Sequence, residues 1–141
     1  MLRILIADDH EIIRKGLKEI LIEEFPLASL EEACDGEILV NKAMSAEWDI
    51  IISDIAMPGV NGIDALRRLK KHVPKIPVLL LSIHPEEQYT KWILKLGASG
   101  YLSKESATKE LINAVHIILK GRNYISPEIE QTSAKRTITV L

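Results

Sequence analysis

Residues 50–62, with the sequence IIISDIAMPGVNG, decide the fold of this chain. Three β-branched isoleucines in succession predict a strand that is buried on both faces, as in the middle of a parallel sheet. The strand ends at one carboxylate, Asp54, and the proline and glycines after it predict an open loop. Ligands of open α/β sheets bind beyond the carboxyl ends of the strands, so we interpret Asp54 as a chemical site, a phosphate acceptor.

The remaining chain predicts a strand followed by a helix, repeated five times. The strands are expected at 3–7, 28–34, 49–53, 78–81 and 100–103, and the helices between His10 and Pro26 and at 37–46, 63–72, 84–97 and 107–120. Such alternation is typical of an α/β protein, a doubly wound five-stranded parallel sheet between two helix layers. We expect the flavodoxin-like strand order 2-1-3-4-5. The apolar stripe of the first helix comprises Ile12, Ile13, Leu17, Ile20 and Leu21.

Length and composition place the chain among single-domain soluble proteins. It has 141 residues, 47% hydrophobic and 27% charged, with a net charge of −2 that argues against non-specific DNA binding. The apolar run at the N-terminus is too short for a signal peptide or a membrane span, so we expect a cytoplasmic protein without membrane contact. Cys34 is the only cysteine and is expected in the core; it excludes an internal disulfide.

Polar residues follow four of the predicted strands. Asp8 and Asp9 follow the first strand, Asp54 the third, Ser82 the fourth and Lys104 the fifth. In the order 2-1-3-4-5 these strands are neighbours, so the five side chains should meet in one pocket. Three carboxylates brought together repel one another unless a cation lies among them. Oxygen ligands of this kind suit Mg²⁺.

Four motifs in this order resemble the receiver domain of bacterial response regulators. They are ADDH at 7–10, SDIAMPG at 53–59 with Gly62, LS at 81–82, and GASGYLSK at 97–104. The acidic start, the last of these motifs and YISPE at 124–128 are similar to the NarL/FixJ subfamily. The resemblance covers about residues 2–121. We therefore expect residues 1–121 to form the receiver domain.

The resemblance implies two-component signalling, a phosphorelay in which Asp54 accepts phosphate from a sensor histidine kinase. Asp9, Asp54 and the main-chain carbonyl of Ala56 would ligate Mg²⁺, with Asp8 acting through water. Lys104 would hold one phosphoryl oxygen. The domain would catalyse its own phosphotransfer and dephosphorylation, without being a turnover enzyme.

The resemblance also implies a switch. The Ser82 hydroxyl would move to a phosphoryl oxygen and the Tyr101 ring would turn inward, remodelling the face of the fourth helix, fifth strand and fifth helix. That change could drive homodimerisation or transcription regulation through an effector. Residues 122–141 are expected to form a short helix and a linker toward an absent effector, a helix-turn-helix DNA-binding domain; the alternative is a stand-alone receiver acting through protein contacts.

Two residues depart from the receiver pattern. Many receivers have a proline after the lysine, often with a cis bond, but Glu105 follows Lys104 here and no cis bond is assumed. Ile83 stands where the family often has a small residue, and it could change the dephosphorylation rate. His10 lacks a second histidine at ligand spacing and is interpreted as a surface residue.

Other functions were weighed against the same residues. A flavodoxin-type flavin carrier needs a Ser/Thr/Gly-rich phosphate loop after the first strand, where this chain has acids. An aspartyl phosphatase needs an acid two residues beyond its nucleophile, where this chain has Ala56. A receiver-shaped scaffold that is never phosphorylated would not need the acidic pocket.

Overall fold

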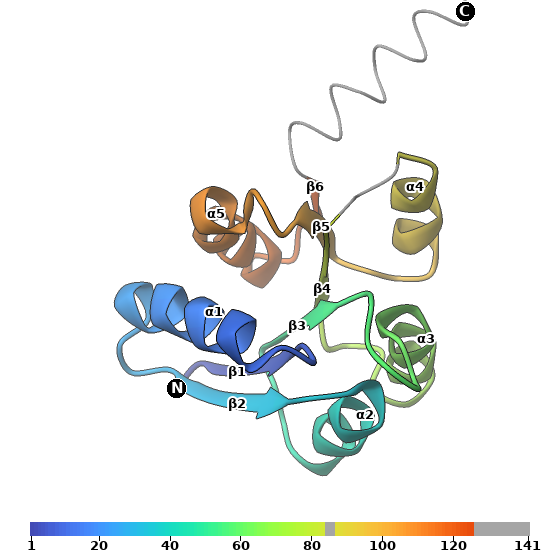
Figure 1. Ribbon diagram of the computed structural model, residues 1–141, viewed down its shortest axis with the longest axis horizontal. Coiled ribbons are helices and arrows are strands. Elements are labelled where there is room, and N and C mark those ends of the chain that lie inside the picture. The colour runs from blue at the N-terminus through green and yellow to red at the C-terminus, as the bar shows by residue number, and fades with distance from the viewer. Residues whose placement is uncertain (84–86, 126–141) are drawn as a thin grey trace, which may run out of the picture.

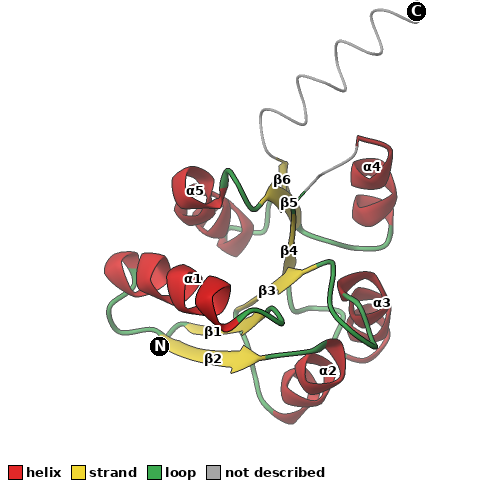
Figure 2. Ribbon diagram, in the orientation of Figure 1, coloured by secondary structure: helices red, strands yellow, loops and turns green. Residues whose placement is uncertain are grey.

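The computed structural model describes residues 1–83 and 87–125, which form six strands and five helices (Figures 1 and 2). The strands are β1 (Arg3–Ala7), β2 (Ser29–Ala33), β3 (Ile50–Asp54), β4 (Val78–Ser82), β5 (Gly100–Ser103) and β6 (Tyr124–Ile125). The helices are α1 (Glu11–Glu24), α2 (Gly36–Ser45), α3 (Gly62–His72), α4 (Glu87–Lys95) and α5 (Ala107–Leu119). The predicted start of the fourth helix at 84–86 lies outside the described residues.

The sheet is parallel throughout, in the order β2-β1-β3-β4-β5-β6. The predicted doubly wound fold and the order of its five strands are therefore confirmed, with one strand more than expected. In β3, Ile50 and Ile52 face the helix layer of α1 and α5, whereas Ile51 faces the layer of α2, α3 and α4 (Figure 1). The same alternation in β1 and β4 gives the sheet two hydrophobic cores, one on each face.

Two of the predicted turns also begin helices. The Asp35 side chain accepts a hydrogen bond from the Ile38 N–H at 2.8 Å, at the start of α2. The Asn61 side chain does the same for the Asp64 N–H at 2.9 Å, at the start of α3. Each cap satisfies a helix N–H that has no partner within the helix, so these short polar residues determine where the two helices begin.

The sixth strand was not predicted from the sequence. Tyr124 pairs with Gly100 and Ile125 with Tyr101, and the Tyr124 N–H donates to the Ser99 carbonyl at 2.9 Å. A Cβ atom at position 100 would lie 2.9 Å from the Tyr124 carbonyl oxygen, so only glycine allows this close approach. The sheet thus extends past Gly121, and the short helix expected at 126–128 lies outside the described residues.

Three side chains expected inside the protein are exposed. Ile12 is 82% exposed and Ile13 is also exposed, whereas Leu17 and Leu21 of the same stripe are buried. Both isoleucines belong to the first turn of α1, next to the loop that follows β1. Cys34 is exposed because it follows the last residue of β2 and lies in the loop to α2. In the part of the chain that the structure describes, no helix is long and apolar enough to cross a membrane.

Candidate functional site

The acceptor candidate Asp54 is the last residue of β3, and the residue is only 3% exposed. The Ala56 N–H donates to its Oδ1 atom at 3.3 Å. The loop after β3 returns so closely that a side chain at Gly62 would clash with the Asp54 carbonyl oxygen. Gly62 therefore allows α3 to begin directly against the backbone of the candidate site.

The acidic pair lies at the end of β1, next to β3. Asp8 is fully buried, and its Oδ1 atom accepts a hydrogen bond from the His10 N–H at 2.8 Å. The Nδ1 atom of the His10 ring lies 3.0 Å from Asp8 Oδ1 and 3.1 Å from Asp9 Oδ1. His10 was predicted to be a surface residue and a poor metal ligand; its side chain is 60% exposed, as predicted, but its ring also contacts both acids. The relevant signal was that it follows two acids directly.

The Lys104 ammonium joins the two buried carboxylates. Its Nζ atom lies 3.0 Å from Asp54 Oδ2 and 2.9 Å from Asp8 Oδ2. The Lys104 N–H donates to the Ser82 carbonyl at 2.8 Å, which ties the end of β5 to the end of β4. All peptide bonds of the described residues are trans, including the one before Glu105. The structure therefore brings Asp8, Asp54 and Lys104 together at one edge of the sheet.

The charges at this site do not balance, because one ammonium faces two buried carboxylates. Burial raises the pKa of Asp54, and the charge of Asp8 adds to this, while the hydrogen bond and charge of Lys104 offset part of the increase. Burial lowers the pKa of Lys104, but its contacts with Asp8 and Asp54 outweigh that effect and the pKa is raised overall. The site as a whole favours an additional positive charge.

The donor atoms fit a hard divalent cation. Ligand atoms of Asp8, Asp9, His10 and Asp54 all lie within 4.8 Å of one another. Asp8 Oδ2 is buried and lacks a hydrogen bond among the described residues, since its contact with Lys104 is an ion pair without hydrogen-bond geometry. Carboxylate oxygens that are partly unsatisfied are the ligands that Mg²⁺ takes, usually together with several waters. When bound, such an ion would neutralise an incoming anion beside Asp54.

The other predicted residues lie near this edge, in different environments. Leu81 pairs with Asp54 across β3 and β4, so Ser82 follows one residue beyond the acceptor and is half-buried. Ala56 is exposed in the loop after β3. Tyr101, in β5, is 1% exposed and lies in the core that contains Ile93 of α4. Its ring is therefore buried within the protein.

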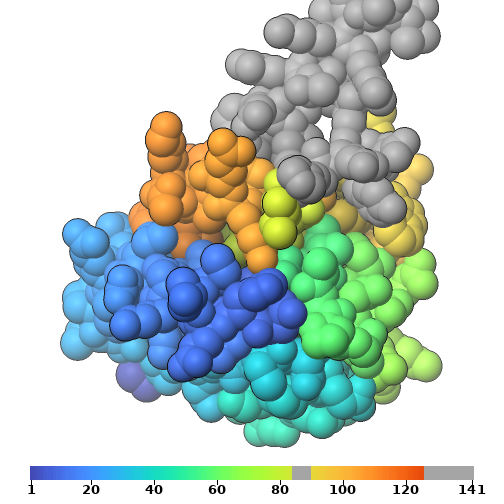
Figure 3. Space-filling model, in the orientation of Figure 1, coloured from blue at the N-terminus to red at the C-terminus, as the bar shows by residue number. Residues whose placement is uncertain are grey.

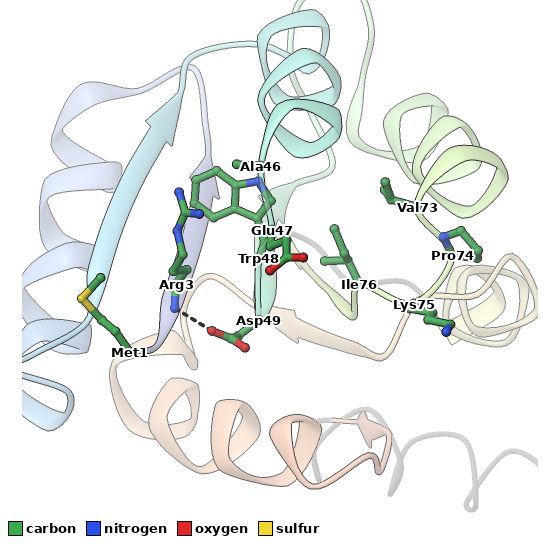
Figure 4. Close-up of a pocket in the computed structure, with 10 residues that line it drawn as sticks. All are labelled: Met1, Arg3, Ala46, Glu47, Trp48, Asp49, Val73, Pro74, Lys75 and Ile76. Carbon is green, nitrogen blue, oxygen red and sulfur yellow. Dashed lines mark hydrogen bonds between the residues drawn. The ribbon is translucent and has the colours of Figure 1, made fainter.

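Two hollows lie at opposite ends of the sheet. One, of about 850 Å³, adjoins the carboxylates and is lined by Asp9, His10, Glu11, Ile12, Ile13, Ile83, Lys104 and Glu105. Figure 3 shows the segments concerned, in blue, yellow-green and orange, meeting on one face. The other, of about 570 Å³, lies around Trp48 and Asp49 at the start of β3 (Figure 4). It contains none of the predicted site residues, whereas the first hollow is lined by Asp9 and Lys104, with Asp8 and Asp54 outside its lining.

Comparison with known proteins shows the family to which this chain belongs. Residues 4–116 match the response regulator receiver domain. The chain belongs to the response regulator receiver family. The transcriptional regulatory protein DegU of Brevibacillus brevis is 41% identical over 134 residues, which cover 95% of this chain and 57% of that protein. The response regulator UvrY of Escherichia coli K12 is 31% identical over 134 residues, covering 95% and 62% of the two chains.

Solved structures of response regulators also resemble this receiver. The crystal structure of a two-component response regulator of the LuxR family from Aurantimonas sp. SI85-9A1 superposes with a TM-score of 0.89 at 33% identity, covering 96% of this chain and 97% of that one. A structure of the response regulator RcsB in complex with DNA has a TM-score of 0.83 at 25% identity, covering 92% and 66%. This receiver chain spans 57–64% of the length of the first curated relatives that it matches.

Proposed function

We propose that this receiver accepts a phosphoryl group on Asp54 from a histidine kinase and thereby changes an output surface. One observation carries the proposal: the buried Asp54 carboxylate and Asp8 share a single ammonium, Lys104, at 3.0 and 2.9 Å. In this transfer an Asp54 oxygen forms a bond to phosphorus, and the bond between phosphorus and the kinase histidine breaks. The electron pair of that bond returns to the histidine nitrogen.

The neighbouring residues would each have a part in the transfer. Asp9, Asp54 and the Ala56 carbonyl would hold Mg²⁺, with Asp8 acting through water, and the ion would neutralise the phosphoryl oxygens. The Lys104 ammonium already lies beside Asp54 and would bind one of those oxygens as a point charge. The Ser82 hydroxyl would bind another, since Ser82 lies one residue beyond the partner of Asp54 in β4.

An apolar rim beside the acids supports a protein phosphodonor. Ile12, Ile13 and Ile83 are exposed and line the same hollow as Asp9 and Lys104. Single exposed isoleucines are common, but a contiguous exposed apolar patch rimmed by polar residues marks a site of protein interaction. A kinase helix that presents its phosphohistidine to Asp54 would cover this rim, and this is the contact that we propose.

The output would pass through the face of α4, β5 and α5. Tyr101 of β5 lies in the same core as Ile93 of α4, so movement of the ring or of Ser82 would change how α4 packs. Since the curated relatives are longer than this chain, we propose that the receiver controls a helix-turn-helix DNA-binding domain in a longer cytoplasmic protein, with homodimerisation on phosphorylation. The RcsB relative, of which a DNA complex is known, is consistent with this output.

The phosphate acceptor can be tested with small phosphodonors. Acetyl phosphate or phosphoramidate with Mg²⁺ should add one phosphoryl group, measured by intact mass, and the addition should be lost in Asp54→Asn. Asp49→Asn is the matched control, because Asp49 directly precedes β3 at its other end and is exposed. Equal labelling of the Asp54→Asn variant and the wild type would refute the acceptor assignment.

A further inference from the structure

Arg14 of α1 connects the acidic pair to the edge of the sheet. Its Nη1 atom donates to the main-chain carbonyl of Asp8 at 2.7 Å, and its Nε atom donates to Glu32 Oε1 at 3.1 Å. The Arg14 side chain is only 14% exposed. A planar guanidinium donates in fixed directions, so these two bonds define the position of the Asp8 carbonyl relative to β2.

Glu32 is itself held in place by three cations. Its second oxygen, Oε2, accepts a hydrogen bond from Lys18 Nζ at 3.0 Å, and its main-chain carbonyl accepts one from Lys42 Nζ at 2.6 Å. The hydrogen bond of Lys18, together with Arg14, lowers the pKa of the Glu32 carboxyl despite partial burial. Both oxygens of the Glu32 side chain are therefore occupied, and the carboxylate provides a fixed point for the Arg14 fork.

The Asp8 peptide is held from both sides as a result. The Asp8 N–H donates to the Ala33 carbonyl of β2 at 3.1 Å, and the Asp8 carbonyl accepts from Arg14. The peptide between Asp8 and Asp9 is planar, so holding its carbonyl sets the backbone on either side. Both carboxylates of the acidic pair take their direction from this one peptide.

We infer that Arg14 is a positioning residue of the phosphoacceptor site, which sets the affinity of the acidic pair for its divalent cation by fixing the Asp8–Asp9 peptide. The inference rests on the proposed function, because it needs that cation site. Arg14 acts through geometry: its charge is matched by Glu32, and its contact with Asp8 is to the main chain. Residues that orient metal ligands from outside typically change metal affinity by 10- to 100-fold, so we expect the lower end of this range for a single hydrogen bond.

The test measures the dissociation constant of Mn²⁺. Electron paramagnetic resonance gives the concentration of the free ion directly. Arg14→Met should raise the dissociation constant about tenfold. Lys18→Met is the matched control: it removes one positive charge and a hydrogen bond to the same Glu32, but Lys18 is not bonded to Asp8, so its dissociation constant should change less than about twofold. Arg14→Lys should give an intermediate value, because a single ammonium cannot replace the fork.

Thermal unfolding without metal separates positioning from stability. A merely structural role would lower the melting temperature of Arg14→Met and Lys18→Met alike and leave both dissociation constants at the wild-type value, which would overturn the inference. If Arg14→Met does not fold, Glu32→Met replaces it, because it removes the acceptor of the Arg14 Nε hydrogen bond, and it should weaken Mn²⁺ binding in the same direction; unchanged affinity in Glu32→Met would also overturn the inference. Absence of Mn²⁺ binding by the wild type would instead refute the cation site of the proposed function, and the inference with it.

Discussion

The two ends of the sheet use similar residues in opposite ways. At the carboxyl end, Asp8, Asp54 and Lys104 are buried together, and the positive charge does not match the negative charge. At the amino end, the Arg3 N–H donates to Asp49 at 2.7 Å, while the Arg3 guanidinium lies 4.8 Å from the ring centroid of Trp48 (Figure 4).

Solvent explains the difference between the two ends. Arg3 and its partner Glu31 have side chains that are 35% and 44% exposed. Water therefore screens their charges, and the desolvation cost of each charge is small. Asp8 and Asp54 have lost nearly all of their contact with water, which makes an unbalanced charge expensive. Charges retained at such a cost indicate a functional site, whereas the amino end shows the polar contacts of an ordinary stable surface.

The largest expected effect is at Lys104. Lys104→Met leaves two buried carboxylates without a cation, so the free energy of unfolding in EDTA should fall by about 3 kcal/mol. Lys75→Met at the amino end is the matched control, because Lys75 is exposed, and it should change stability by less than about 0.5 kcal/mol. Urea unfolding with and without Mg²⁺ measures both. Equal losses in the two variants would contradict the contrast between the ends.

A smaller effect is expected at Tyr124, which pairs with the first residue of β5. Its hydroxyl donates to Glu110 Oε1 at 2.7 Å, so Tyr124→Phe should lower stability by about 1.5 kcal/mol without changing phosphorylation. Burial, together with the Glu110 carboxylate, raises the pKa of Tyr124 to about 12. The protonated hydroxyl therefore stabilises the fold fully below pH ~10, the value for an unfolded tyrosine, and this stability is lost as pH rises toward 12.

The measurement is urea unfolding of both proteins from pH 8 upward. The wild type should lose its advantage over Tyr124→Phe above pH ~10. A difference that stays constant with pH would contradict a raised pKa of Tyr124 in the fold. No difference between the two proteins at any pH would show that the anchoring of β6 depends on packing alone.

The smallest expected effect has the opposite sign. Because the pKa of Asp54 is raised by burial, the folded protein holds this proton more tightly than the unfolded chain does. The wild type therefore loses stability as pH rises through that pKa, and Asp54→Asn does not. In EDTA at pH 7 the variant should be more stable by about 1 kcal/mol, roughly 3 °C in melting temperature.

The higher stability of Asp54→Asn relative to the wild type should disappear below pH ~4, where the Asp54 carboxyl is protonated in both the folded and the unfolded wild type. Melting curves across pH measure this, with Asp49→Asn as the control at the other end of β3. Destabilisation of Asp54→Asn at pH 7 would mean that Lys104 compensates for the burial of both acids.

The elements of the fold that could be predicted from the sequence are those with a local sequence pattern. The strands that were predicted each have an apolar run, and the caps at Asp35 and Asn61 act within three residues. The strand β6 has two residues, too few for any periodicity, and depends on Gly100 in a distant part of the chain. The stripe of α1 was predicted correctly at Leu17 and Leu21 and wrongly at Ile12 and Ile13, because periodicity does not say which turns of a helix the rest of the fold covers.

Some contacts of the candidate site could likewise be predicted from the sequence, and others could not. The meeting of Asp8, Asp54 and Lys104 follows from strand order, because the carboxyl ends of neighbouring parallel strands share one edge. His10 directly follows the two acids, so its contact with them had a signal in the sequence. The contact of Arg14 with the Asp8 carbonyl could not be predicted, since it depends on a side-chain direction in the folded chain.

The amino-acid sequence by itself determined which strands are central and which end of the sheet receives the acids, because apolar runs and strand order are properties of the chain. Only the tertiary structure decided that Asp8 and Asp54 are desolvated while Asp49 remains in water. The physical reason is that the cost of a charge depends on everything packed around it, and most of those neighbours are distant in sequence.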